Sequence, residues 1–169
     1  KDLKVFKGNL KKQGYISEVK SVLSEFAQYG VDFERLDDFM KEVPPESYLH
    51  YKLDDIRTIY EKFEEYLSEK YITKEEMLDV LSDAVPYSDI LKGSVVAMDG
   101  FTGFTPVQNR LIGELFSVCE KVMITVTMDG RENPYVYEHP YQIFALGKQM
   151  VTSLMKIAGE KKTEIEEPI

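Results

Sequence analysis

The chain has 169 residues, of which 43% are hydrophobic, and its 30 acidic side chains outnumber 21 lysines and arginines to give a net charge of −9. A chain of this size can form one domain with a core or two small lobes. Its acidic balance argues against a strong binder of nucleic acid or membrane. No apolar run approaches the roughly 20 residues that cross a bilayer. The one cysteine, Cys119, allows no internal disulfide and no thiolate metal site, so we expect a cytoplasmic protein.

The first half of the chain predicts helices. The stretch SEVKSVLSEFAQYG spaces its apolar residues by three and four, with Ser17 as an N-cap and Gly30 as the stop. Residues 51–71 repeat this pattern, and Thr73 and Glu76 form a capping box before a third helix. Prolines separate the predicted helices, where helices must end: Pro44, Pro45 and Pro86.

The second half predicts a βαβ unit. SVVAM at residues 94–98 is a short apolar run, typical of a strand buried on both faces. Thr105 is a candidate N-cap for the following helix, with Pro106 at N1 and Gln108 at N3. VMITVTMD, at residues 122–129, predicts a second strand parallel to the first, joined by a right-handed crossover. The last predicted helix covers residues 141–160.

The fold class predicted from these elements is α/β. We expect a helical lobe over residues 10–92, a βαβ-α portion over 93–159 and a polar tail over 160–169. Two parallel strands alone leave exposed edges. The sequence also opens on KDLKVF without Met, so we interpret it as a piece of a longer protein, unless LKVF supplies another strand.

Asp99 is the residue with the clearest chemical interest. It follows the predicted strand 94–98, and ligands of parallel sheets bind beyond the carboxyl ends of the strands. A single Asp there could coordinate Mg²⁺, as a Walker-B aspartate does, but Gly100 has no side chain to activate water. The alternative is a structural Asp99 that caps nearby backbone N–H groups.

AMDGFTGFTPVQ resembles the second motif of UvrD/RecB-like helicases, in which Asp-Glu-x-Gln-Asp-Thr is often followed by Pro and Gln. In this alignment Asp99 matches the metal-binding Asp and Gly100 matches the catalytic Glu. The remaining matched positions are Thr102, Gly103, Phe104, Pro106 and Gln108. DGFTGFTP, the helix after it and KVMITVTMD are more closely similar to the B subunit of the AddAB (RexAB) helicase–nuclease family, as are VFKGNLKKQGYISEV and KLDDIRTIYEKFEEYL.

The resemblance implies the middle of a RecA-like (P-loop NTPase) domain with a large helical insertion. It implies a parent protein that, together with the A subunit of the helicase–nuclease, unwinds and degrades DNA ends for recombinational repair. ATP, Mg²⁺ and an iron–sulfur cluster belong to that parent, but these residues contain no G-x-x-x-x-G-K-[ST] phosphate loop and only Cys119. We therefore expect no cofactor in this segment, no hydrolysis of ATP by it and no catalytic residue within it.

Two alternatives stay open for the function. The segment could belong to a working helicase ATPase that takes its carboxylate from elsewhere, such as Asp129, or it could be a protein-interaction module unrelated to DNA. For DNA contact the candidates are Lys7, Lys11 and Lys12, which lie in a locally basic start, although a solvated face explains them more simply. We expect DNA binding by the segment alone to be weak or absent.

The remaining candidates favour structural roles. Phe101 and Phe104 are more typical of a core or an interface than of base stacking. His50 and His139 lack a partner residue at helical spacing, and Cys119 falls on the apolar side of its helix. The tyrosines of NPYVYEHPY could stack on single-stranded DNA, but a loop bounded by prolines and packed on the sheet is the simpler expectation.

Overall fold

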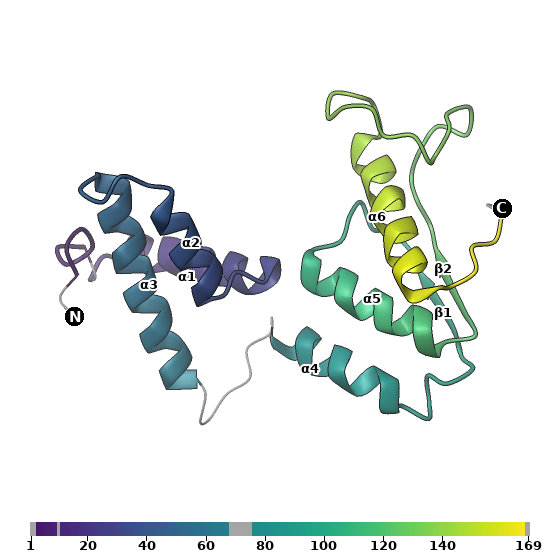
Figure 1. Cartoon of the computed structure of the whole chain (residues 1–169), viewed down its shortest axis with the longest axis horizontal. Coiled ribbons are helices and arrows are strands. Elements are labelled where there is room, and N and C mark those ends of the chain that lie inside the picture. The colour runs from purple at the N-terminus through teal and green to yellow at the C-terminus, as the bar shows by residue number, and fades with distance from the viewer. Residues whose placement is uncertain (1–2, 10, 68–75, 168–169) are drawn as a thin grey trace. The chain divides into compact units, whose positions relative to one another are not determined.

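The computed structural model describes residues 3–9, 11–67 and 76–167 and divides the chain into two compact units, Lys1–Met77 and Leu78–Ile169. Each unit is described by itself. The first unit holds α1 (Gln13–Tyr29), α2 (Phe33–Lys41) and α3 (Tyr48–Leu67), as Figure 1 shows. α4 (Glu76–Ala84) spans the unit boundary, and the second unit continues with η1 (Val85–Tyr87), β1 (Val95–Met98), α5 (Pro106–Val118), β2 (Lys121–Ile124) and α6 (Ala145–Lys161).

The core of the first unit gathers around Tyr60 of α3. Its ring lies 5.8 Å from that of Phe26 on α1 and 4.7 Å from that of Phe33 on α2. Its hydroxyl donates to the backbone oxygen of Val31 at 3.4 Å. Because one side chain contacts the helices on either side of the α1–α2 turn, it fixes how that turn meets α3. Each helix also contributes a buried aliphatic residue to this core: Leu23, Leu36 and Ile56.

The predicted limits of these helices are partly right. α1 ends at Gly30, which adopts the left-handed conformation (φ 62°), as its glycine predicted. The N-cap prediction at Ser17 is wrong, because α1 begins a turn earlier after Lys12, whose side chain makes no capping bond. α2 was not predicted, although Asp32 caps it by accepting from the backbone N–H of Arg35 at 2.9 Å. The predicted Thr73 cap and the end of the 51–71 helix lie outside the described residues.

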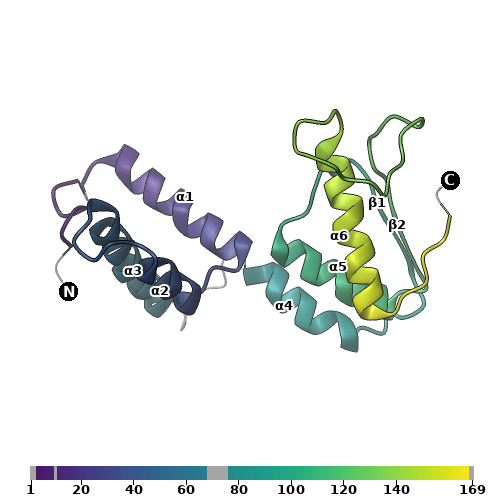
Figure 2. The same cartoon turned by 45° about the horizontal axis from the view of Figure 1, so that its top comes forward.

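The parallel sheet confirms the predicted βαβ unit. Val95 lies opposite Lys121 and Met98 lies opposite Ile124 in a parallel register. α5 connects the two strands, and α5 and α6 lie on the same side of the sheet (Figure 2). The buried core of the unit includes Val107, Ile112 and Leu115 of α5 and Met150 and Ala158 of α6. The architecture is mixed helical with a small parallel sheet, in agreement with the α/β class.

One expectation for the sheet is wrong, and the alternative of a strand from LKVF is not borne out. The strands are not buried on both faces, because Val95 is 56% exposed and Met123 is 41% exposed on the face that α5 and α6 leave uncovered. LKVF forms bends at residues 4–6 and adds no strand. The apolar run SVVAM therefore forms a strand with one face exposed.

Helix α6 fits closely against the rest of its unit at two glycines. A Cβ on Gly147 would lie 2.9 Å from the backbone oxygen of Thr127, and one on Gly113 of α5 would lie 3.2 Å from Cγ2 of Ile157. Lys161 Nζ adds an ion pair across the two helices, 2.8 Å from Glu114 Oε1. The absence of side chains at both glycines therefore sets how α6 packs.

α4 is tied to α5 by one arginine. Arg110 Nη1 lies 2.6 Å from Asp79 Oδ1 and its Nη2 lies 2.5 Å from Asp83 Oδ1. The two carboxylates are one helical turn apart, so a single guanidinium fork reaches both.

Among the helices that the structure describes, none combines the length and apolarity of a membrane span. The three-part domain division predicted from the sequence stays a prediction.

Candidate functional site

The strand ends place Asp99 beside Thr125. Asp99 follows β1 directly, Thr125 follows β2, and the Thr125 hydroxyl donates to Asp99 Oδ1. The backbone N–H of Thr125 also donates to the oxygen of Met98 at 3.0 Å, which extends the sheet pairing by one bond. Asp99 is exposed, so water reaches the part of the carboxylate that Thr125 leaves free. The predicted site residue therefore lies where a strand-end ligand site would be, and it already has a protein partner.

The backbone conformation at position 100 favours glycine. Its φ is 81°, a left-handed conformation that side chains disfavour, while an added Cβ would meet no atom within 4 Å. A glutamate at this position would have room for its side chain but would strain the backbone. The turn after Asp99 therefore favours glycine at this position.

The residues after Gly100 serve the start of α5. Thr105 accepts from the Gln108 backbone N–H at 3.4 Å, and Gln108 Oε1 accepts from the Thr105 N–H at 2.9 Å, which confirms the N-cap prediction as a full capping box. The rings of Phe101 and Phe104 lie 4.9 Å apart, and Phe101 is 39% exposed. Within residues 101–108, the two phenylalanines therefore contact each other, and Thr105 and Gln108 cap α5.

The alternative carboxylate, Asp129, is engaged by its neighbour. Arg131 Nη2 lies 2.6 Å from Asp129 Oδ2, and the Arg131 backbone N–H donates to Oδ1 at 2.9 Å. These two hydrogen bonds hold the pKa of Asp129 below its ordinary value, the side-chain bond being the larger cause. A general base that activates water needs a raised pKa, so this environment does not suit that task. Across residues 3–9, 11–67 and 76–167 we find no cluster of three or more potential metal ligands.

The candidate DNA-binding lysines belong to the first unit, whereas Asp99 belongs to the second. Lys7, Lys11 and Lys12 are all exposed, and Lys12 is the N-cap residue of α1. The backbone N–H of Lys12 donates to the oxygen of Asn9 at 2.9 Å, within a short run of turns that leads into α1. Their side chains are therefore accessible to solvent.

A buried carboxylate that the sequence did not reveal anchors this segment. Asp55 of α3 is 1% exposed and accepts three consecutive backbone N–H groups, from Lys4 at 2.8 Å, Val5 at 2.6 Å and Phe6 at 2.9 Å. Lys4 Nζ lies 3.5 Å from Asp54 Oδ2. The only sequence signal was the pair of acids in the helix pattern KLDDIRTIY, and its partner lies about 50 residues away in the chain.

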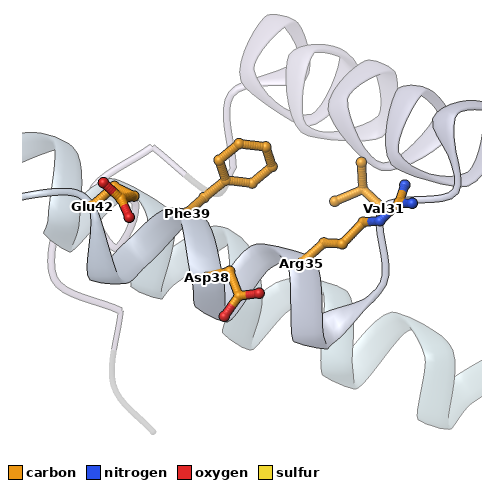
Figure 3. A pocket seen from close by; sticks show the side chains of 5 residues that line it. All are labelled: Val31, Arg35, Asp38, Phe39 and Glu42. Atoms are coloured by element: carbon orange, nitrogen blue, oxygen red, sulfur yellow. The ribbon is translucent and has the colours of Figure 1, made fainter.

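The helical unit also carries an open hollow of about 420 Å³ between α2 and the turn before it, shown in Figure 3. Phe39, which is 59% exposed, lines it with Val31. Arg35 lies at its edge and donates to the oxygen of Gly30 at 3.1 Å, so its guanidinium is used to close the end of α1. This hollow contains none of the residues predicted as site residues.

Two further predictions concern Cys119 and His139. Cys119 is the C-cap of α5 and is half-buried, not a residue of the apolar helix face, with its sulfur 3.6 Å from Ser94 Oγ. His139 is hydrogen-bonded, as expected, because its Nδ1 accepts from the Tyr141 N–H at 3.2 Å.

Comparison with known proteins defines the family. Residues 1–169 match the family model described as ADDB, N-terminal. The chain is 41% identical over 169 residues to the B subunit of the ATP-dependent helicase/deoxyribonuclease from Lachnoclostridium phytofermentans, covering 99% of this chain and 15% of the relative. It is 33% identical over 168 residues to the protein of the same name from Thermoanaerobacter pseudethanolicus, covering 99% of this chain and 14% of that relative. The chain belongs to the AddB N-terminal family, and it spans about one seventh of the length of these relatives.

Proposed function

We propose that this chain is a non-catalytic segment of the B subunit of a helicase–nuclease, a complex that processes DNA double-strand ends for recombinational repair. The observation that carries the proposal is Gly100, held at φ 81° directly after the strand-end Asp99. The resembled helicase motif has its water-activating glutamate at that position. In this proposal the motor fold persists while the hydrolytic step is absent.

The sheet supports a partial RecA-like domain. β1 and β2 are parallel neighbours joined through α5, which is the repeating unit of such a domain. The uncovered face around Val95 and Met123 suits further elements of the same polypeptide. In this proposal the helices within residues 10–92 are an insertion into that domain.

Cofactors and partners follow from the same proposal. ATP, Mg²⁺ and the iron–sulfur cluster of the full-length protein would be bound by regions outside these 169 residues, because a four-cysteine cluster cannot be built with Cys119 alone. The A subunit would be the protein partner in the full complex. The segment would serve as a scaffold that helps to hold both DNA and the A subunit.

The test of this role is DNA-end degradation by the complex of the full-length B subunit with the A subunit. Asp99→Asn keeps an oxygen that can accept from Thr125 and removes the charge that a metal ion would require. We expect this variant to degrade DNA ends at the wild-type rate. A loss of more than about tenfold, which is more than 1.4 kcal/mol of transition-state stabilisation, with the complex still assembled, would show Asp99 to be catalytic.

For DNA contact, we propose that Lys7, Lys11 and Lys12 touch the phosphate backbone. The segment alone should bind weakly, because dedicated non-specific binders reach dissociation constants of roughly 10⁻⁴ to 10⁻⁶ M and this chain has a net charge of −9. Fluorescence anisotropy with single-stranded and duplex oligonucleotides should show binding that falls with salt and is lost in the triple Lys→Glu variant. Submicromolar binding that survives this change would place the affinity on another surface.

A further inference from the structure

The connection between β2 and α6 exposes a concentration of apolar side chains. We name residues 129–144 the tyrosine loop. Tyr141 is 91% exposed and Ile143 is 74% exposed, while Leu146, at the start of α6, is 66% exposed. An exposed apolar cluster of this kind usually marks a contact surface. The other exposed apolar residues of the loop are Tyr135, Val136, Tyr137 and Phe144.

The tyrosine loop has a defined conformation. At its start, Glu132 Oε2 lies 2.5 Å from Nζ of Lys148, whose side chain is only 6% exposed. Near its end, Gln142 Nε2 donates to Glu138 Oε2 at 2.7 Å, and Gln142 Oε1 accepts from the Glu138 N–H at 3.2 Å. An ion pair to the buried Lys148 and two hydrogen bonds between Gln142 and Glu138 therefore hold the loop near both of its ends, while its aromatic side chains are exposed.

The charge of the loop is unbalanced at one residue. Lys148 neutralises Glu132, and Arg131 neutralises Asp129 at 2.6 Å. Glu138 is exposed, and no ion pair to it occurs among the residues that the structure describes. It lines an open hollow of about 560 Å³ together with the apolar side chains Val136 and Ile143. Its other lining residues are Glu132, Asn133, Gln142 and Lys148, so the hollow combines two apolar side chains, two amides, the Lys148–Glu132 ion pair and the carboxylate of Glu138.

This combination favours a cationic side chain with an apolar neighbour. Exposed tyrosine faces attract Arg and Lys through their negative ring faces, and Glu138 adds a charge partner. The long apolar stem of Arg or Lys can lie along Val136 or Ile143. Nucleic acid fits poorly, because Glu138 repels phosphates and the nearby Lys148 is already buried and paired.

We propose that the tyrosine loop is the docking surface for another segment of the same full-length polypeptide, one that presents an Arg or Lys beside an apolar side chain. Relatives such as the Lachnoclostridium protein share only 15% of their length with this chain, so most of such a polypeptide would be tethered to the loop at high effective concentration. The inference goes beyond the proposed function, because it holds whether or not the strand-end site is catalytic.

The test places a photo-crosslinking amino acid, p-benzoylphenylalanine, at Tyr141 in the full-length B subunit. The ring is 91% exposed, and the backbone N–H of this residue keeps its bond to His139. Irradiation followed by mass spectrometry should yield a peptide of the same polypeptide, from outside these 169 residues, with Arg or Lys next to an apolar residue. The same photo-crosslinker at Lys156, which is 79% exposed on α6, should not yield this peptide.

A charge variant tests the chemistry of the contact. Glu138→Gln keeps an oxygen that can accept from Gln142 and removes the negative charge, so the cross-link yield should fall roughly threefold or more. Glu120→Gln, at an exposed acid before β2, should leave the yield unchanged. The proposal is overturned by a cross-linked peptide without Arg or Lys, by cross-links only to the partner protein or to DNA, by no yield above the Lys156 control, or by an unchanged yield in Glu138→Gln.

Discussion

Thr125 donates a hydrogen bond from its hydroxyl to the carboxylate of Asp99, which links the residues that directly follow the two parallel strands. A strand-end aspartate in this arrangement contributes to the sheet itself, since it holds the end of β1 to the end of β2. Gly100 follows in a left-handed turn, a conformation that glycine adopts without strain. Both features support the proposal that this strand end has a structural role and no catalytic one.

The turn at Gly100 predicts a cost for any side chain there. Gly100→Ala should lower the free energy of unfolding by about 1 to 2 kcal/mol, because a left-handed φ of 81° strains an L-residue. Gly103→Ala is the matched control, since Gly103 has no positive φ and an added Cβ meets nothing within 4 Å. Urea unfolding of the two variants measures the difference, and equal stability of both would refute the strained-turn explanation.

Two glycines of α6 predict opposite effects for the same substitution. Gly147→Ala should destabilise the protein by about 1 to 3 kcal/mol, because its Cβ would lie 2.9 Å from the Thr127 backbone oxygen, which cannot move freely. Gly159→Ala should stabilise it by up to about 1 kcal/mol, because there the Cβ meets nothing and alanine favours the helix. Thermal unfolding distinguishes them; a stabilised Gly147→Ala variant would mean that α6 does not approach Thr127 this closely.

The anchor at Asp55 predicts a large loss. Asp55→Ala should lower the free energy of unfolding by about 2 to 4 kcal/mol, because it leaves three backbone N–H groups without their acceptor. Hydrogen exchange at the amides of Lys4, Val5 and Phe6 should quicken in the same variant. Asp38→Asn, which breaks only an exposed pair with Lys41, should stay within about 0.5 kcal/mol of the wild type. Unchanged amide protection in Asp55→Ala would contradict the anchor.

Glu64 predicts a pH-dependent stability. Burial, and then the charge of Glu76, raise the pKa of its carboxyl in the folded state. Its contribution to stability is therefore full below the ordinary glutamate pKa of 4.5 and falls as the pH rises through the folded-state value. Glu64→Gln should thus stabilise the protein near neutral pH, by less than about 1 kcal/mol because the group is largely solvated. Below about pH 4, where the glutamate is protonated, the variant should match the wild type.

The neighbouring Glu65 is the control for this pH test, because its pKa is shifted in the opposite direction. Its hydrogen bond with Lys62 holds the pKa of its carboxyl below the ordinary value, so its contribution is present above the unfolded pKa and is lost as the pH falls. Glu65→Gln should therefore shift stability in the direction opposite to Glu64→Gln. Urea unfolding across the pH range measures both, and shifts of the same sign would contradict these local causes.

Local signals in the sequence predicted much of the second unit. The Thr105 capping box, Pro106 at N1 and the two β-branched runs each specify their element within a few residues. A helix that connects two neighbouring strands then favours a parallel pair. The prediction that the strand containing Val95 is buried on both faces was wrong for a physical reason. Hydrophobicity reports what a residue contacts in the complete fold, and this chain spans 15% of the Lachnoclostridium relative.

Contacts distant in sequence explain what was missed. The role of Asp55 depends on backbone N–H groups about 50 residues earlier, and no local pattern encodes that pairing. α2 is only nine residues long, and its Asp32 cap was a local signal that could have found it. The sequence also did not predict the backbone conformation of Gly100, because glycine adopts either sign of φ with little cost.

We expect this chain to hydrolyse no ATP, and steady-state ATP turnover by the purified chain, with and without single-stranded DNA, tests this expectation most directly. The measurement pairs the wild type with Asp99→Ala. We expect both proteins to remain at the background rate, because Gly100 supplies no carboxylate and Asp129 is held by Arg131. Turnover above background that disappears in Asp99→Ala would show that the strand-end site is catalytic and would contradict this account.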